Sequence, residues 1–220
     1  FAADGHDRGA RFAVGQVLGE GRTAVFTGVL DADKQGFLIR READAGNHVG
    51  RVERGLLHIL KIVVRVAVEL DLADFDLPVY DEPHHPRLRN YEHDHTKAWS
   101  ASVESADAFV FVTPEYNYGP PPSLVNALNY LVHEWGEKVA GFVSYGGVSG
   151  GLRAVQVEKL MLTSFKIMPL PEQVTIPMFP QHLDAETTFT PNDLHETSAK
   201  AMLDELVRWG GALKAMRAAR

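Results

Sequence analysis

The chain has 220 residues, of which 45% are hydrophobic and 23% are charged, so it is long enough for one well-filled core and has the composition of an ordinary soluble domain. Its net charge of -7 disfavours non-specific attraction to nucleic acid or an anionic membrane, and charged residues interrupt the longest apolar stretch before it could span a bilayer. The chain contains no cysteine, which excludes a disulfide scaffold, thiolate metal ligands and a cysteine nucleophile; we expect a cytoplasmic protein that binds neither nucleic acid nor membrane.

Residues 1–65 differ in composition from the rest of the chain. They contain ten Lys or Arg and eight Asp or Glu, whereas residues 66–220 contain twelve and twenty-one, and all twelve prolines lie in the second part. We therefore expect an atypical N-terminal segment over residues 1–65, either irregular or replacing the first βα unit, with residues 1–55 packed less regularly than the rest. Its apolar runs are strand candidates at residues 12–18, 23–30 and 36–39, and residues 56–68 fit a strand or a helix.

From residue 66 onward, strand and helix patterns alternate. Apolar runs predict strands at residues 106–112, 138–144 and 173–176, and residues 66–78 resemble a strand followed by a turn. Apolar residues at helical spacing predict helices at residues 92–104, 123–131, 150–165 and 192–217. Strands that alternate with helices are typical of a parallel sheet with helices on both faces.

The stretch 106–120 combines an apolar run with a polar, aromatic and proline-rich loop. Phe and Val alternate in the run without a polar residue, which suits a strand covered on both faces. The loop then lies at the carboxyl end of a strand, where open α/β sheets bind ligands. Ser123 is the predicted N-cap of the helix that follows.

Two sequence motifs in this part carry a family resemblance. Residues 113–117 read Thr-Pro-Glu-Tyr-Asn, and residues 126–131 continue with Asn-Ala-Leu-Asn-Tyr-Leu. About thirty residues further on, residues 141–154 form a strand followed by a glycine-rich loop. The two motifs, in this order, resemble the third and fourth strands of the NADPH-dependent FMN reductase family.

The resemblance covers residues 66–217 and implies a flavodoxin-like three-layer sandwich with a five-stranded parallel sheet. It implies an NAD(P)H-dependent FMN reductase that passes hydride from NADPH to bound FMN and on to small acceptors such as quinones or flavins. It also implies a homodimer or homotetramer. The alternative is a non-catalytic flavodoxin-like protein that lacks a competent site for the FMN phosphate.

The resemblance places the flavin site on the two loops. Glycine-rich turns let backbone amides approach the N1/O2 edge of the flavin ring, where they stabilise its reduced form. Glu115 and Asn117 offer side-chain hydrogen bonds, and Tyr116 and Tyr118 line or cover the ring. The predicted cofactor-binding residues are Thr113, Pro114, Glu115, Tyr116, Asn117, Tyr118, Ser144, Tyr145, Gly146, Gly147, Ser149, Gly150 and Gly151.

The phosphate half of the expected site is not recognisable in the sequence. In the family, the first strand ends in a Gly-Ser/Thr-x-Arg loop that opens a helix and holds the FMN phosphate. The nearest candidate here is residues 18–23, Leu-Gly-Glu-Gly-Arg-Thr. Glu20 would face the phosphate there, and the residues that follow have a strand pattern, so we interpret this segment as an ordinary turn.

The sequence also contains possible features of two other kinds of site, a metal site and the nucleophile of a hydrolase. His84, His85, His93 and His95 lie close together near several carboxylates, but their spacing matches no defined metal site, so we expect no metal. Ser149 lies in a Gly-x-Ser-x-Gly pattern, but a nucleophile elbow needs the serine directly on a strand-to-helix turn, with an acid and a histidine later. The family loop explains these glycines better than a hydrolase does.

Overall fold

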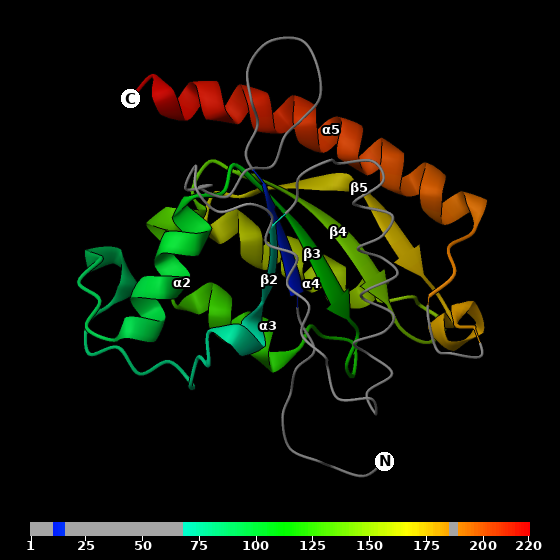
Figure 1. Cartoon of the computed structure of the whole chain (residues 1–220), viewed down its shortest axis with the longest axis horizontal. Helices are drawn as coiled ribbons and strands as arrows, with labels where there is room; N and C mark the ends of the chain where they lie inside the picture. The colour runs from blue at the N-terminus through cyan, green and yellow to red at the C-terminus, as the bar shows by residue number, and fades with distance from the viewer. Residues whose placement is uncertain (1–10, 16–67, 185–188) are drawn as a thin grey trace, which may run out of the picture.

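The computed structural model describes residues 11–15, 68–184 and 189–220, which form a sheet with helices on both faces (Figure 1). The strands are β1 (Arg11–Gly15), β2 (Val68–Asp71), β3 (Ala108–Pro114), β4 (Val139–Tyr145) and β5 (Met168–Ile176). The helices are α2 (Asp94–Glu104), α3 (Pro122–Asn129), α4 (Leu152–Ser164) and α5 (Asp193–Ala218). Short 3-10 turns lie at Leu72–Asp74, Pro86–Leu88, His133–Trp135 and Phe179–His182.

The strand order in the sheet is β2-β1-β3-β4-β5. β3 pairs in parallel with β4, and β4 with β5, whereas β1 is antiparallel to both of its neighbours. The prediction of a fully parallel five-stranded sheet is therefore wrong, because β1 runs antiparallel to its neighbours. The parallel pairs involve β3, β4 and β5. An alternating pattern has the same period in either direction, so the sequence could not decide this point.

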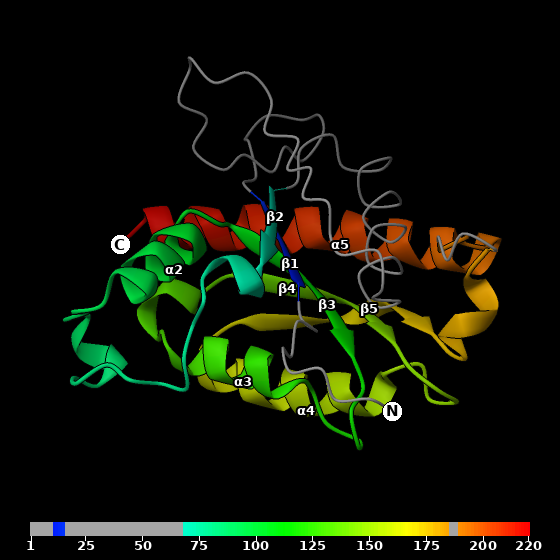
Figure 2. The same cartoon turned by 60° about the horizontal axis from the view of Figure 1, so that its bottom comes forward.

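Two helical layers cover the sheet (Figure 2). Helix α5 packs on one face against the side chains of Val110, Val112 and Val143. Helices α2, α3 and α4 pack on the other face against Phe111 and Phe142, among others. Because successive side chains of a strand point to opposite faces, the continuous apolar runs of β3 and β4 supply both cores at once, as predicted for buried strands. Every residue of both strands is buried.

Most of the predicted elements after residue 66 are present, with shifted ends. β5 begins at Met168, five residues earlier than predicted, because Pro169 and Pro171 are tolerated on this edge strand. Ser123 is not the N-cap of α3: Pro121 holds that position, and the helix begins at Pro122. Proline suits the first helical position, since the N–H it lacks would have no helical acceptor there.

Most of the atypical N-terminal segment, including the candidate phosphate loop at residues 18–23, lies outside the described residues. β1 overlaps the strand predicted at residues 12–18 but begins one residue earlier and ends three residues earlier. Its last residue, Gly15, pairs with Ala108, while Arg11 pairs with Val112. The chain therefore leaves β1 at the end of the sheet opposite to the Pro114 end of β3. The division of the chain at residue 65 stays a prediction.

No helix in the described ranges combines the length and the hydrophobicity needed to cross a bilayer.

Candidate functional site

The loops that follow β3 and β4 meet at the same end of the sheet (Figure 1). The strands are parallel, and Pro114 lies opposite Tyr145 in the pairing register. The backbone N–H of Glu115 continues this pairing and donates to the Tyr145 carbonyl at 3.1 Å. The two motifs of the family resemblance therefore form one continuous rim at the carboxyl ends of adjacent strands, where a parallel sheet offers a ligand crevice.

The loop after β3 is a tight turn that projects two tyrosines. Tyr116 and Gly119 exchange two backbone hydrogen bonds of 2.9 Å each. Between them, Asn117 and Tyr118 have φ angles of +49° and +72°, which is the arrangement of a type I′ turn. Both tyrosine side chains are exposed. The turn thus presents aromatic surface to whatever occupies the rim.

The loop after β4 contains glycines with different surroundings: two are tightly packed and one is open to solvent. Gly151 has a φ of +87°, and an added Cβ there would lie 2.7 Å from the Cβ of Ser144. At Gly150 an added Cβ would lie 2.7 Å from the backbone N of Pro177. Both glycines therefore serve the packing of the loop on the sheet. Gly147 has open space where its Cβ would be, so its lack of a side chain leaves the backbone accessible.

The tip of this loop offers backbone donors. A hydrogen bond of 3.1 Å from the Gly150 N–H to the Gly147 carbonyl closes the turn. Within the described residues, no acceptor is found for the N–H groups of Gly147, Val148 and Ser149. Successive N–H groups of this kind attract oxygen atoms that carry negative charge. They lie in the glycine-rich loop for which the sequence predicted backbone donors to a flavin, and that role stays a prediction.

A polar network ties the two loops together. Glu115 accepts hydrogen bonds from the Ser149 hydroxyl at 2.9 Å, from the Arg153 backbone N–H at 3.0 Å and from Arg153 Nε at 2.7 Å. The Arg153 guanidinium lies 3.9 Å from the centre of the Tyr118 ring. Burial alone would raise the pKa of Glu115, but the bonds from Arg153 and Ser149 outweigh it and lower this pKa. Glu115 is thus an ionised clamp between the loops.

Several predicted site residues point into the interior instead of toward the rim. Thr113 bonds to Glu158 of α4, Ser144 donates to the Gly150 carbonyl at 2.9 Å, and the Tyr145 ring packs edge-on against Phe179. The side chains of Thr113, Ser144 and Tyr145 are buried. They can support the loops but offer no surface to a ligand.

Sequence reasoning did not assign site roles to three residues that contribute to the rim. Arg153 clamps Glu115, and exposed Val148 and Met178 add apolar surface beside the tyrosines. Met178 joins the rim because its N–H donates to the Gly147 carbonyl at 2.8 Å. The position of Arg153 could have indicated a site role, since it follows the glycine-rich loop at the start of a helix. Nothing in the sequence around Met178 indicated such a role, since only the packing of the chain after β5 brings it to the rim.

These features fit the ring of a flavin better than its phosphate. Exposed tyrosines and Val148 suit a planar apolar ring, and the N–H groups at Gly147–Ser149, which have no acceptor in the described part of the chain, suit its oxygen-bearing edge. The described residues contain no serine- or threonine-rich helix start beside this rim that could take over the phosphate. The end of β1, the first described strand, lies at the opposite end of the sheet.

Two histidines of the cluster, His93 and His95, lie beside Asp81 and form hydrogen bonds with it. His95 Nε2 lies 3.1 Å from Asp81 Oδ1, which also accepts from the Tyr130 hydroxyl at 2.9 Å. The rings of His93 and His95 stack, with their centres 5.2 Å apart. In the part of the chain that the structure describes, no group of three or more histidine or carboxylate side chains is arranged to hold a metal ion.

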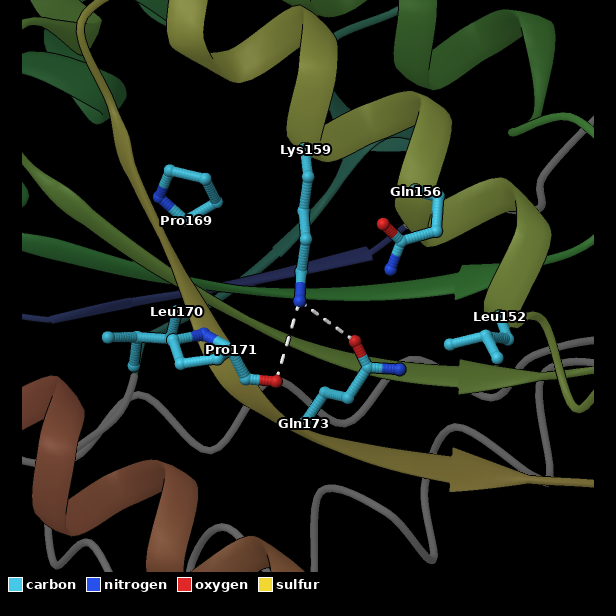
Figure 3. A pocket seen from close by; sticks show the side chains of 7 residues that line it. All are labelled: Leu152, Gln156, Lys159, Pro169, Leu170, Pro171 and Gln173. Carbon is cyan, nitrogen blue, oxygen red and sulfur yellow. Dashed lines mark hydrogen bonds between the residues drawn. The ribbon is translucent and has the colours of Figure 1, made fainter.

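A separate hollow of about 640 Å³ lies on the flank of the sheet, between α4 and the edge strand β5 (Figure 3). Lys159 reaches across it and donates to the Gln173 side chain at 3.0 Å and toward the Pro171 carbonyl at 3.5 Å. Burial lowers the pKa of Lys159. Because the lysine already holds two carbonyl oxygens and the hollow is wide open to solvent, we assign no function to it.

Comparison with known proteins identifies the family of this chain. The sequence profile described as NADPH-dependent FMN reductase matches residues 46–181, more than half of the chain. The chain belongs to this family. An NAD(P)H-dependent FMN reductase of Schizosaccharomyces pombe is 42% identical over 112 residues, which cover 50% of this chain and 56% of the relative. The chain thus spans little more than half the length of this FMN reductase.

Two further relatives extend the comparison. A probable NADPH:quinone oxidoreductase of Oryza sativa subsp. japonica is 42% identical over 62 residues, 27% of this chain and 30% of that protein. The solved structure of FerB, a flavoenzyme NAD(P)H:(acceptor) oxidoreductase from Paracoccus denitrificans, superposes with a TM-score of 0.57 and 18% identity over 79% of this chain and 93% of its own. At that identity the likeness establishes the fold, which is the flavodoxin-like α/β fold of these FMN reductases.

Proposed function

We propose that this protein is an NAD(P)H-dependent FMN reductase whose flavin lies at the rim formed by the Tyr116–Gly119 turn and the Gly147–Gly150 turn. One observation carries the proposal: at the carboxyl ends of β3 and β4, exposed aromatic side chains lie on one loop, and the adjacent loop has backbone N–H groups without an acceptor among the described residues. Family membership supplies the chemistry that this surface would serve. NADPH is the proposed electron donor.

The proposed site separates residues that contact the flavin from residues that hold them. Tyr116, Asn117, Tyr118, Gly147 and Ser149 present exposed or half-exposed atoms at the rim. The supporting residues are Thr113, Pro114, Glu115, Ser144, Tyr145, Gly146, Gly150 and Gly151, whose side chains or close backbone contacts fix the two loops.

Bound FMN would supply the hydride chemistry, accepting hydride from NADPH and passing electrons to an acceptor. The chain contributes position and electrostatics. The N–H groups of Gly147, Val148 and Ser149, for which the described residues offer no acceptor, would stabilise negative charge that develops on the flavin during reduction without having to reorganise. Glu115 is already neutralised by Arg153, so it adds no net repulsion toward that charge.

We propose small quinones or free flavins as electron acceptors. The rice relative is named as a quinone oxidoreductase, and the rim is open and carries the apolar side chains Val148 and Met178. A planar apolar acceptor suits such a surface. We also propose, from the family resemblance, a cytoplasmic homodimer or homotetramer. Light scattering of the purified protein measures the subunit number, and a monomer would contradict this part.

Flavin binding tests the function directly. We expect the purified chain to take up FMN, to show the absorbance of a bound flavin and to oxidise NADPH when a quinone is present. Riboflavin is the matched probe for the phosphate: if no loop holds the phosphate, riboflavin and FMN bind with similar affinity. A protein that binds neither flavin and leaves NADPH unoxidised would instead be the non-catalytic flavodoxin-like alternative.

A further inference from the structure

Glu158 is a carboxyl group enclosed in the core directly beneath the proposed flavin site. It lies on α4 and is 1% exposed. Its Oε1 atom lies 2.6 Å from the Thr113 hydroxyl, near the end of β3. Its Oε2 atom is buried, and no partner for it is found among the described residues. A buried ionised carboxylate normally requires several donors, and this one has a single neutral donor.

No charged group compensates Glu158 from the elements around it. β3, β4 and α3 contain no charged residue, and the one charged residue of β5, which also packs against α4, is Glu172, a carboxyl that cannot compensate another carboxylate. The other charged residues of α4 are Arg153, which binds Glu115, and Lys159, which binds Gln173 and Pro171. Burial raises the pKa of Glu158 to about 8, although the Thr113 hydroxyl lowers it in part. At neutral pH the carboxyl is therefore mainly protonated and uncharged.

The protonation state of Glu158 decides which bond the Thr113 hydroxyl can make. This hydroxyl lies within reach of two acceptors, Glu158 Oε1 at 2.6 Å and the Pro114 carbonyl at 3.3 Å. A hydroxyl has one proton to donate. If Glu158 is protonated, it donates to Thr113, and Thr113 is free to donate to Pro114. If Glu158 is ionised, Thr113 must donate to the carboxylate and leaves the Pro114 carbonyl without this donor.

We propose that Glu158 is a positioning residue that, as a neutral acid, holds the end of β3 through Thr113, so that loss of its proton loosens the turn carrying Tyr116 and Tyr118 and weakens flavin binding. The inference rests on the proposed function for its last step. The mechanical link is short, because Pro114 directly precedes Glu115, the residue that clamps the two loops together.

The test compares the wild type with Glu158→Gln, which keeps the size of the side chain and can donate to Thr113 but cannot ionise. FMN affinity is measured by quenching of flavin fluorescence between about pH 6.5 and about pH 9.5, a range that brackets the titration. We expect the wild-type affinity to fall by about fivefold or more relative to Glu158→Gln across this range. The control is Glu196→Gln, an exposed carboxyl on α5, which should follow the wild type.

Amide hydrogen exchange of a peptide covering residues 113–119 provides a readout that needs no flavin. Compared at the same alkaline pH, we expect faster exchange in the wild type than in Glu158→Gln, and equal exchange at pH 6.5. Identical pH dependence of affinity and exchange in the two proteins would overturn the inference. If neither protein bound FMN at any pH, the proposed function would fail, and the exchange comparison would still decide the role of Glu158.

If Glu158→Gln did not fold, Thr113→Val would take its place, since it removes the hydroxyl through which Glu158 acts. We expect this variant to lose the pH dependence of FMN binding and of exchange. A variant that kept the full wild-type dependence would contradict the inference.

Discussion

The two ends of the parallel strands differ in how their polar groups are satisfied. At the amino end, the Asp107 carboxylate is bonded by Lys214 at 2.8 Å and by Arg217, both from α5. Buried Lys138 donates to the Val103 and Glu104 carbonyls at 2.7 and 3.1 Å, and so bonds the last turn of α2. This end is closed by bonds between elements that are distant in the sequence.

At the carboxyl end, donors and apolar side chains are left exposed. The N–H groups of Gly147 to Ser149 find no acceptor among the described residues, and the side chains of Tyr118 and Val148 are largely exposed. One clamp, between Glu115 and Arg153, holds the loops. The difference is consistent with our proposal that the carboxyl end binds the flavin, since parallel sheets bind ligands at this edge, while the amino end serves stability.

Gly151→Ala is expected to have the largest effect, because it disrupts the glycine-rich loop at the carboxyl end of the parallel strands. The new Cβ would lie 2.7 Å from Ser144 Cβ and 2.9 Å from the Tyr145 N, at a φ of +87°. We expect the free energy of unfolding in urea to fall by about 3 kcal/mol and FMN binding to be lost. Gly147→Ala is the matched control: its Cβ meets nothing within 4 Å, so unfolding should change by less than about 0.5 kcal/mol. Equal losses in both variants would contradict this division of roles.

Lys138→Met tests the amino end and is expected to have an intermediate effect. It leaves two carbonyls at the end of α2 without their donor, so we expect a loss of about 2 kcal/mol in the free energy of unfolding and no change in FMN affinity. The control, Lys200→Met, removes an exposed pair with Asp204 and should cost less than about 0.5 kcal/mol. A loss of flavin binding in Lys138→Met would mean that the two ends are coupled.

The same lysine predicts a pH dependence. Burial lowers the pKa of Lys138 to about 8 from its ordinary value of 10.5. Between these values the unfolded chain holds a proton that the folded chain has released, so stability rises with pH in this window. Urea unfolding at a series of pH values should show the wild type gaining stability over Lys138→Met from pH 8 to 10.5.

Glu115→Gln is expected to have the smallest effect on stability but to weaken FMN binding at the proposed site. Because Arg153 is half exposed, water screens the pair, and we expect a loss below about 1 kcal/mol. FMN affinity should fall by about fivefold, since the loops lose their ionised clamp. Since the pKa of Glu115 is lowered, the stability advantage of the wild type should be complete above pH 4.5 and fade at lower pH. Glu205→Gln, which removes a pair with Arg208 on α5, should leave FMN binding unchanged.

The sequence by itself determined β3, β4 and the two loops that follow them. The continuous apolar runs could be satisfied only by strands buried on both faces. The Thr113–Asn117 motif and the glycine-rich loop marked the carboxyl ends of β3 and β4, the edge at which open α/β sheets bind ligands. These features are local, because strand burial and turn chemistry depend on residues that are neighbours in the chain.

Only the tertiary structure decided which side chains meet and which way β1 runs. Arg153 reaches Glu115 across 38 residues, and Glu158 reaches Thr113 across 45. Nothing in the pattern around either partner specifies the other. Thr113, Ser144 and Tyr145 matched the family motif, yet their side chains are buried against α4, the glycine loop and Phe179. The physical reason is that a motif records residue types in order, whereas contacts between distant residues depend on how strands and helices pack in space.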